Sequence, residues 1–233
     1  MVQNQRRSTI SNASANATAV VTLGSVWPQD PTFVYARDTN IRVVEIDAAQ
    51  SISARAEGVA VLKKNNSEVS RYVWLNPNNL TTMASIVAKD FKKLWPEHSQ
   101  IIDKNLQALR VTFLEVVRDQ QTFVLDNDID TVVLLSPTLE DFASGNQLFV
   151  DETIYEPELE WSDEQKRSIQ EKFTDDDSLW LLTDKKPSTT LTSMVPKARI
   201  LVVDPLTRWG SQGIDSDFPF ERWTISALDN TSK

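Results

Sequence analysis

The chain has 233 residues, of which 40% are hydrophobic, and a formal net charge of -9. This size and composition allow one large or two small domains with packed cores. The negative charge argues against a nucleic-acid partner, because phosphate binding relies on clusters of lysine and arginine. The sequence contains no cysteine, which excludes disulfides, thiolate metal sites and cysteine nucleophiles.

Residues 1–18 are rich in Asn, Ser, Ala and Thr, and no apolar stretch follows the pair Arg6 and Arg7. A signal peptide requires such a stretch, so none is visible in this chain. We expect a disordered leader over these residues. The same composition fits the remnant of a precursor whose export signal has been removed. No apolar run approaches the roughly 20 residues that span a bilayer.

Short apolar segments then alternate with turn-forming residues. The run at 41–47 is almost continuously apolar, which is typical of a strand covered on both faces in a parallel α/β sheet. The first third of the sequence predicts, in chain order, a strand at 19–23, a short helix opened by Asp30 and Pro31, and a strand at 41–47. An irregular or strand-like piece follows at 58–62, and a short buried run at the end of a strand lies at 73–75.

Two helical patterns occupy the middle of the chain. Asn76 caps the first helix and Pro77 takes its first position, and a helical apolar stripe then continues until Pro96 ends the helix. The second helix begins near Ser99 and extends to about Gln121, which is long enough to connect two lobes.

The last part of the chain again alternates strands and helices, which favours a parallel α/β lobe. Ser162, with Gln165 three residues later, predicts a capping box at the start of a helix. The predicted elements are a strand at 130–136, a short helix at 137–145, a strand at 147–154, the capped helix, and strands at 178–183, 198–204 and 222–226.

Searches for enzyme motifs give no assembled site. The only histidine, His98, lies at a helix boundary, so a Ser-His-Asp triad is not predicted. Nucleophile-elbow and glycine-rich phosphate-loop patterns are missing from the sequence. The stretch at 126–130 begins like a calcium loop, but Thr131 and Pro137 replace the required Gly and Glu. We therefore predict no catalytic residues and no enzyme.

The seven tryptophans are the remaining signal. An α/β fold binds its ligands near strand ends, and tryptophan also commonly fills cores and domain seams, so both roles stay open. The tryptophans near predicted strand ends or loops are Trp27, Trp74, Trp209 and Trp223.

Three separate stretches resemble the zinc/manganese-type solute-binding proteins of bacterial ABC transporters. They are the Trp-Leu-Asn-Pro junction with its two following helices, the segment "SPTLEDFASG", and the strand "ARILVVDPLTRWG". Together they cover roughly residues 70 to 210. The matching residues in the first stretch are Trp74, Leu75, Pro77, Pro96, Glu97, Asn105 and Leu106.

The resemblance implies an α/β fold of two lobes with parallel sheets, joined by a long and stiff connecting helix, with a metal ion in the cleft between the lobes. The chain before residue 70 is short for such a first lobe, so we expect a shortened one. The expected division is a leader at 1–18, an N-terminal lobe at 19–98, a connecting helix at 99–121 and a C-terminal lobe at 122–233.

The family's usual ligands are His and carboxylate, which suit Zn²⁺ or Mn²⁺. Here Tyr72 and Ser136 stand where the resemblance places histidines, and Asp204 keeps the carboxylate position. A phenol with a pKa of about 10 replaces imidazole poorly, so a tight four-coordinate site is not expected. The hydrogen-bonding groups suit a small polar or anionic organic ligand. The predicted ligand-binding residues are Tyr72, Trp74, Ser136, Asp204, Arg208 and Trp209.

The sequence therefore predicts a monomeric, periplasmic or otherwise extracytoplasmic solute-binding protein with an altered or lost metal site. Its implied partners are an ABC permease and a small solute or metal ion. The alternative is an accessory or interaction protein that keeps the scaffold without a transported solute.

Overall fold

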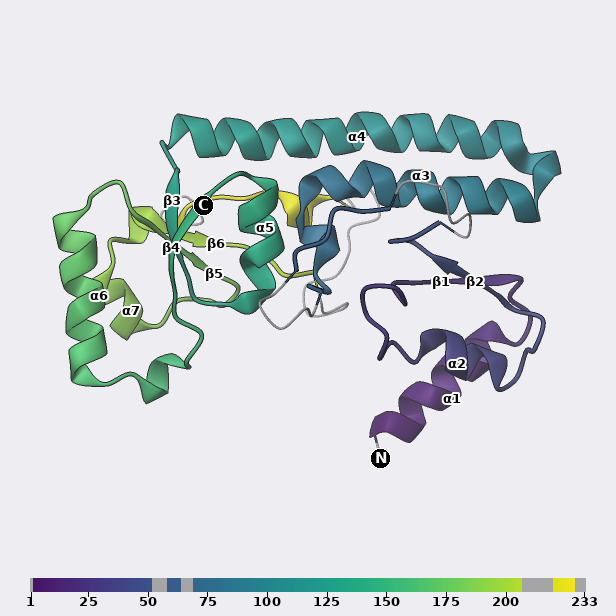
Figure 1. Cartoon of the computed structure of the whole chain (residues 1–233), viewed down its shortest axis with the longest axis horizontal. Helices are drawn as coiled ribbons and strands as arrows, with labels where there is room; N and C mark the ends of the chain where they lie inside the picture. Colours follow the sequence, from purple (N-terminus) through teal and green to yellow (C-terminus); the bar gives the residue numbers. More distant parts are fainter. Residues whose placement is uncertain (1, 52–57, 64–68, 207–219, 229–233) are drawn as a thin grey trace. The chain divides into compact units, whose positions relative to one another are not determined.

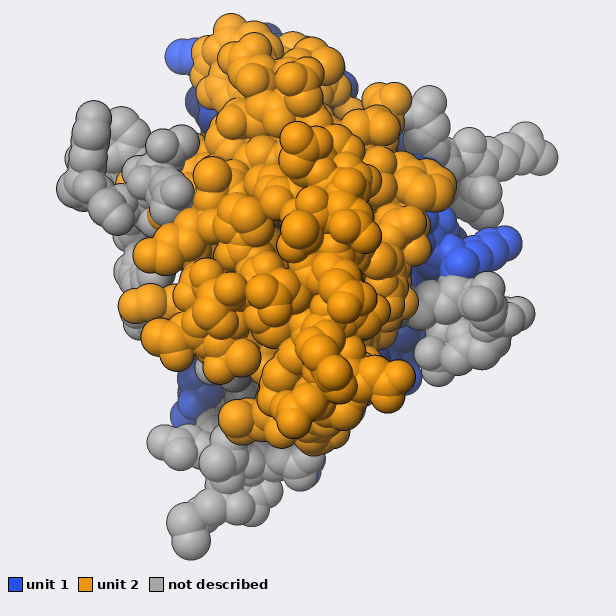
Figure 2. Space-filling model, turned by 90° about the vertical axis from the view of Figure 1, so that its left-hand side faces the viewer, with its two compact units in different colours: residues 1–73, 79–112 blue, residues 74–78, 113–233 orange. Residues whose placement is uncertain are grey.

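The computed structural model describes residues 2–51, 58–63, 69–206 and 220–228. The chain forms two compact units that are interleaved in sequence, which Figure 2 shows in different colours. Unit 1 comprises Met1–Val73 and Asn79–Thr112, and unit 2 comprises Trp74–Asn78 and Phe113–Lys233. The consecutive boundaries expected from the sequence, with lobes at 19–98 and 122–233 and a connecting helix at 99–121, stay a prediction.

Unit 1 contains a two-stranded parallel sheet and a pair of long helices (Figure 1). Strands β1 and β2 pair with Ala19 opposite Val44. The elements that contribute to this unit are α1 (Val2–Ser14), β1 (Ala19–Thr22), α2 (Thr32–Arg37), β2 (Val44–Asp47), most of α3 (Pro77–Leu94), the 3-10 helix η2 (Pro96–His98) and the first half of α4 (Ser99–Asp126).

Helix α1 lies where the composition predicted a disordered leader. Ser11 and Ser14 are buried, and the Ser11 hydroxyl donates to the Tyr35 carbonyl at 2.8 Å. The Asn40 side-chain amide donates to the carbonyls of Ser14 at 3.0 Å and Ala17 at 2.7 Å. The bond to Ser14 satisfies a carbonyl at the C-terminal end of α1, where the helix itself supplies no partner. Small polar residues therefore form this contact, and the composition gave no apolar signal for it.

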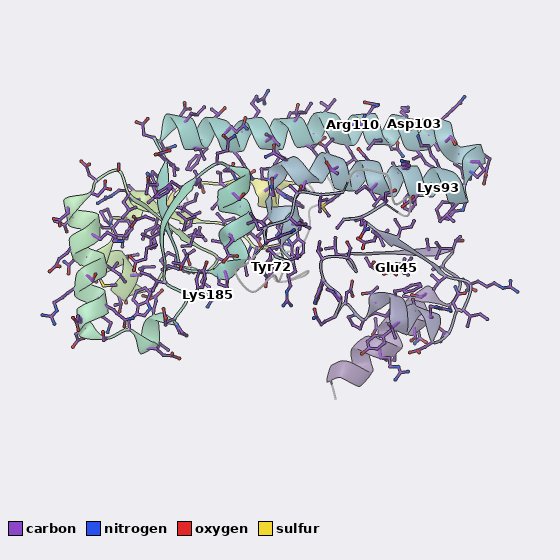
Figure 3. All side chains as sticks on the ribbon, viewed as in Figure 1. Glu45, Tyr72, Lys93, Asp103, Arg110 and Lys185 are labelled. Atoms are coloured by element: carbon purple, nitrogen blue, oxygen red, sulfur yellow. The ribbon has the colours of Figure 1, made fainter. Side chains whose placement is uncertain are left out.

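Helices α3 and α4 form an antiparallel pair within unit 1, near the labels Lys93, Asp103 and Arg110 in Figure 3. Lys92 bonds Asp103 at 2.7 Å, and Arg110 donates to the Ser85 hydroxyl at 3.1 Å. The predicted start of α3 at Pro77 and the restart of the chain as a helix at Ser99 are both confirmed.

Unit 2 is built around a four-stranded parallel sheet with strand order β4-β3-β5-β6. All four residues of β5 are buried, as expected for a strand covered on both faces. Figure 1 shows α6 and α7 on one side of this sheet and α5 on the other. The strands are β3 (Thr131–Leu134), β4 (Phe149–Thr153), β5 (Trp180–Thr183) and β6 (Ile200–Val202), and the helices are η3 (Pro137–Leu139), α5 (Glu140–Gly145), η4 (Glu158–Glu160), α6 (Asp163–Asp175), α7 (Thr189–Met194), η5 (Lys197–Arg199) and η6 (Glu221–Trp223).

Local signals predicted most of these elements but not all. The capping box of α6 is confirmed, since the Gln165 amide donates to the Ser162 hydroxyl at 3.1 Å and the Gln165 side chain accepts from the Ser162 amide at 2.9 Å. The run at 73–75 is a 3-10 helix, η1 (Val73–Leu75), because the chain turns there directly into α3. Residues 222–226 form no strand: they contain the end of η6, and the neighbouring Ala227 makes a single bridge to Leu201. Among the described residues, no helix has the length and apolar character needed to cross a bilayer.

Replacement of Gly145 by alanine is expected to destabilise unit 2. An added Cβ would lie 2.6 Å from Asn76 Oδ1 and 2.8 Å from Pro77 Cδ, so Gly145→Ala should lower the free energy of unfolding by about 1–3 kcal/mol in urea titrations. Gly58→Ala is the matched control, since its nearest neighbour, the Ala49 carbonyl, lies at 3.4 Å. Equal stability of the two variants would contradict this packing.

Candidate functional site

The carboxyl ends of three parallel strands bring the candidate residues of unit 2 to one edge of the sheet. Ser136 lies two residues beyond β3, Asp184 follows β5, and Asp204 lies two residues beyond β6. Because β3, β5 and β6 are parallel and adjacent in this order, their carboxyl ends share an edge, where open α/β sheets bind ligands.

Ser136 is part of a hydroxyl–carboxylate network at this edge. The buried Ser136 hydroxyl donates to Asp184 Oδ2 at 2.9 Å, and Thr138 donates to the same oxygen at 3.0 Å. The Ser136 hydroxyl also accepts from the Thr138 amide at 3.3 Å, which caps η3. Asp184 therefore fixes the orientation of two hydroxyls. The sequence analysis did not single out Asp184, although it directly follows the buried strand β5, just as Asp204 lies shortly after β6.

Asp204 is held by an arginine from the C-terminal part of unit 2. Arg222 Nε donates to Asp204 Oδ2 at 2.7 Å and Nη2 donates to Oδ1 at 2.8 Å, while the Leu206 amide donates to Oδ1 at 2.8 Å. Burial raises the pKa of Asp204, but the hydrogen bonds and the positive charge of Arg222 outweigh it. The pKa of Asp204 therefore lies below its ordinary value, and the carboxylate stays ionised.

Trp74 lies beside the turn that contains Asp204. The Trp74 indole N–H donates to the carbonyl of Pro205 at 3.0 Å, so the structure brings Trp74 and Asp204 into one neighbourhood. Tyr72 belongs to unit 1 and is half-buried, and its position is labelled in Figure 3. Its predicted role stays a prediction. Arg208 and Trp209 lie outside the described residues.

Ser136 and Asp204 are not in direct contact. Strand β5 lies between β3 and β6, so the backbones of β3 and β6 are about 10 Å apart. Each side chain bonds a different partner, Asp184 or Arg222. Within the described ranges, no group of three or more His, Asp or Glu residues is arranged to hold a metal ion. The polar groups at this edge include two hydroxyls, an indole N–H, two carboxylates and a guanidinium.

Comparisons with known proteins identify the fold. No family model matches the chain. No curated protein matches it either. Solved structures do match, although at low sequence identity. The structure of ZnuA has a TM-score of 0.62 and 18% identity, and the match covers 86% of this chain and 76% of that one.

Two further structures agree with this result. A mutant of FpvC from Pseudomonas aeruginosa has a TM-score of 0.65 and 16% identity, covering 91% of this chain and 78% of that one. A Zn(II)-bound variant of AdcAII from Streptococcus pneumoniae has a TM-score of 0.58 and 21% identity, covering 88% and 76% of the two chains. The predicted fold, that of the zinc/manganese-type solute-binding proteins, is therefore confirmed.

The Asp204–Arg222 pair makes stability depend on pH. Asp204→Asn should lower the free energy of unfolding at about pH 7 by about 1–2 kcal/mol, because Arg222 loses a charged partner. The depressed pKa contributes stability above the ordinary aspartate value, and this contribution is lost as the pH falls through the folded-state pKa. The difference between wild type and variant in urea titrations should therefore shrink as the pH falls below the ordinary aspartate value. A difference that stays constant with pH would contradict the assignment, and the exposed Asp177→Asn is the control.

The Ser136 network predicts energetic coupling across the sheet edge. Ser136→Ala and Asp184→Asn should be non-additive by about 0.5–3 kcal/mol in a double-mutant cycle, because Ser136→Ala removes the donor and Asp184→Asn removes the acceptor's charge in the same hydrogen bond. Ser136→Ala combined with Asp177→Asn should add within about 0.5 kcal/mol. Additivity of the Ser136 and Asp184 substitutions would show that the bond contributes nothing in solution.

Proposed function

We propose that this chain is an extracytoplasmic solute-binding protein related to the receptors of metal-ion ABC transporters, and that its metal site is altered or lost. The fold supports the solute-binding role, since the ZnuA, FpvC and AdcAII structures share it over most of both chains. The donor chemistry at the carboxyl edge of unit 2 supports the altered specificity.

The observation that carries the proposal is the state of the three positions that the resemblance assigns to metal ligands. Tyr72 supplies a phenol and Ser136 a hydroxyl, while the carboxylate of Asp204 already accepts three hydrogen bonds. Structural and catalytic zinc sites use imidazole, thiolate or carboxylate ligands, almost always four in number. These three positions therefore do not fit a tight zinc or manganese site.

Neutral hydroxyl groups at the carboxyl edge of unit 2 suit a small polar solute. Ser136 and Thr138 carry neutral hydroxyls just beyond the end of β3, and ligand sites use a few such groups to fix orientation. Under this proposal the chain delivers its solute to an ABC permease, works as a monomer and is not an enzyme. An accessory protein without a solute is the alternative, and the experiment below separates the two.

Isothermal titration of the chelator-treated chain tests the metal part of the proposal. Titration with Zn²⁺ or Mn²⁺ should show only weak binding that is unchanged in Asp204→Asn and in the surface control Asp177→Asn, because Asp204 is not available as a ligand. Tight one-to-one binding that is lost in Asp204→Asn alone would contradict the proposal.

Native mass spectrometry of the chain, purified without unfolding, tests the solute part. We expect an additional mass from a co-purified small organic molecule, reduced in occupancy by Ser136→Ala. A chain that carries no such molecule, and whose thermal stability no small polar solute raises, would favour the accessory role.

A further inference from the structure

The C-terminal segment of unit 2, residues 220–228, is anchored by contacts that do not involve Arg222. Phe220 packs edge-on against Phe113 with ring centroids 5.3 Å apart. The side chain of buried Gln120 donates to the Trp223 carbonyl at 2.8 Å. Ala227 is buried and forms a β-bridge with Leu201 of β6. The backbone on either side of Arg222 is therefore held in place by α4 and by the sheet.

These contacts position the Arg222 guanidinium next to the Asp204 carboxylate. The two planar groups meet through two nearly equal bonds of 2.7 and 2.8 Å, which is the bidentate geometry that favours arginine over lysine. Both side chains are largely withdrawn from solvent, with exposed fractions of 18% for Arg222 and 30% for Asp204. The Leu206 amide takes a further position on Oδ1.

A cation that used both oxygens of Asp204 as ligands would have to displace this guanidinium, because three hydrogen bonds already fill most of the acceptor positions of the carboxylate. Arginine stays protonated at every physiological pH, so deprotonation does not remove this competing positive charge. The two residues are 18 positions apart on one chain, and a tethered group competes at a high effective concentration. The Arg222 guanidinium therefore competes with divalent cations for Asp204 at every physiological pH.

We propose that Arg222 is a tethered counter-cation that takes the place of a metal ion at Asp204 and makes this edge of unit 2 reject divalent cations. This inference deepens the proposed function and rests on it, because it names the residue that sets the altered specificity. The neutral hydroxyl of Ser136 nearby is then left to accept a hydrogen bond from a solute without a metal, whereas the Trp74 indole N–H already donates to the Pro205 carbonyl.

Divalent-cation titrations of the folded chain test this role. Arg222→Gln removes the competitor while keeping a side chain of similar shape, and its affinity for Zn²⁺ and Mn²⁺ should rise at least about tenfold over wild type. The gain should disappear in the double variant Arg222→Gln with Asp204→Asn, and should be smaller in Arg222→Lys, which keeps the charge but not the bidentate fork.

Arg199→Gln is the matched control. It makes the same change in net charge, but Arg199 bonds the carbonyls of Phe173 and Asp176 and immediately precedes β6, at the opposite end of that strand from Asp204. Its affinity for both metals should equal that of wild type. Arg222→Gln that is folded by circular dichroism and binds no more tightly than Arg199→Gln would overturn the inference and leave the proposed function standing. Tight binding by wild type through Asp204 would instead contradict the proposed function.

A measurement on the unmodified chain covers the case in which Arg222→Gln does not fold. Paramagnetic Mn²⁺ broadens the NMR signals of amides close to its binding site. The backbone amide of Leu206, which donates to Asp204, should keep its intensity when Mn²⁺ is added to wild type. Selective loss of this signal at low Mn²⁺ concentration would overturn the inference.

Discussion

Parallel pairing of β3, β5 and β6 is the constraint on which the candidate site depends. The register sets Leu134 beside Leu182 and Thr183 beside Val202, so the chain leaves all three strands at the same edge. The buried residues of β5 hold this alignment through packing on both faces. Polar side chains that follow these strands are therefore gathered by the sheet, although they are far apart in sequence.

At this edge each carboxylate is hydrogen-bonded by groups of the chain itself. Asp184 accepts hydrogen bonds from two hydroxyls, and Asp204 is paired with Arg222. A buried carboxylate needs such partners, because desolvation without them is costly. For Asp204 the guanidinium of Arg222 supplies the positive charge. Hydroxyls and a guanidinium therefore satisfy the two carboxylates of this edge by hydrogen bonding.

Local patterns predicted the parts of the structure that local physics decides. The Pro77 start of α3 and the Ser162 cap of α6 are signals contained within a few residues. Helix α1 depends on the contacts of Ser11 and Ser14 with a later segment, and their polar composition resembles that of a disordered chain. The pairing of Arg222 with Asp204 joins two segments with no shared pattern in sequence, so it was not predictable from spacing. The family resemblance singled out Ser136 and Asp204, which both lie just beyond strands, and a rule based on strand ends, applied to β5, would have added Asp184.

The most direct test of this account is anomalous diffraction at the zinc edge from crystals of the unmodified chain grown with excess Zn²⁺. The account predicts an intact Asp204–Arg222 pair and no anomalous peak within coordination distance of Asp204, which for a zinc–carboxylate bond is about 2.0–2.2 Å. A peak at that distance from the Asp204 carboxylate, with the Arg222 side chain turned away, would contradict it.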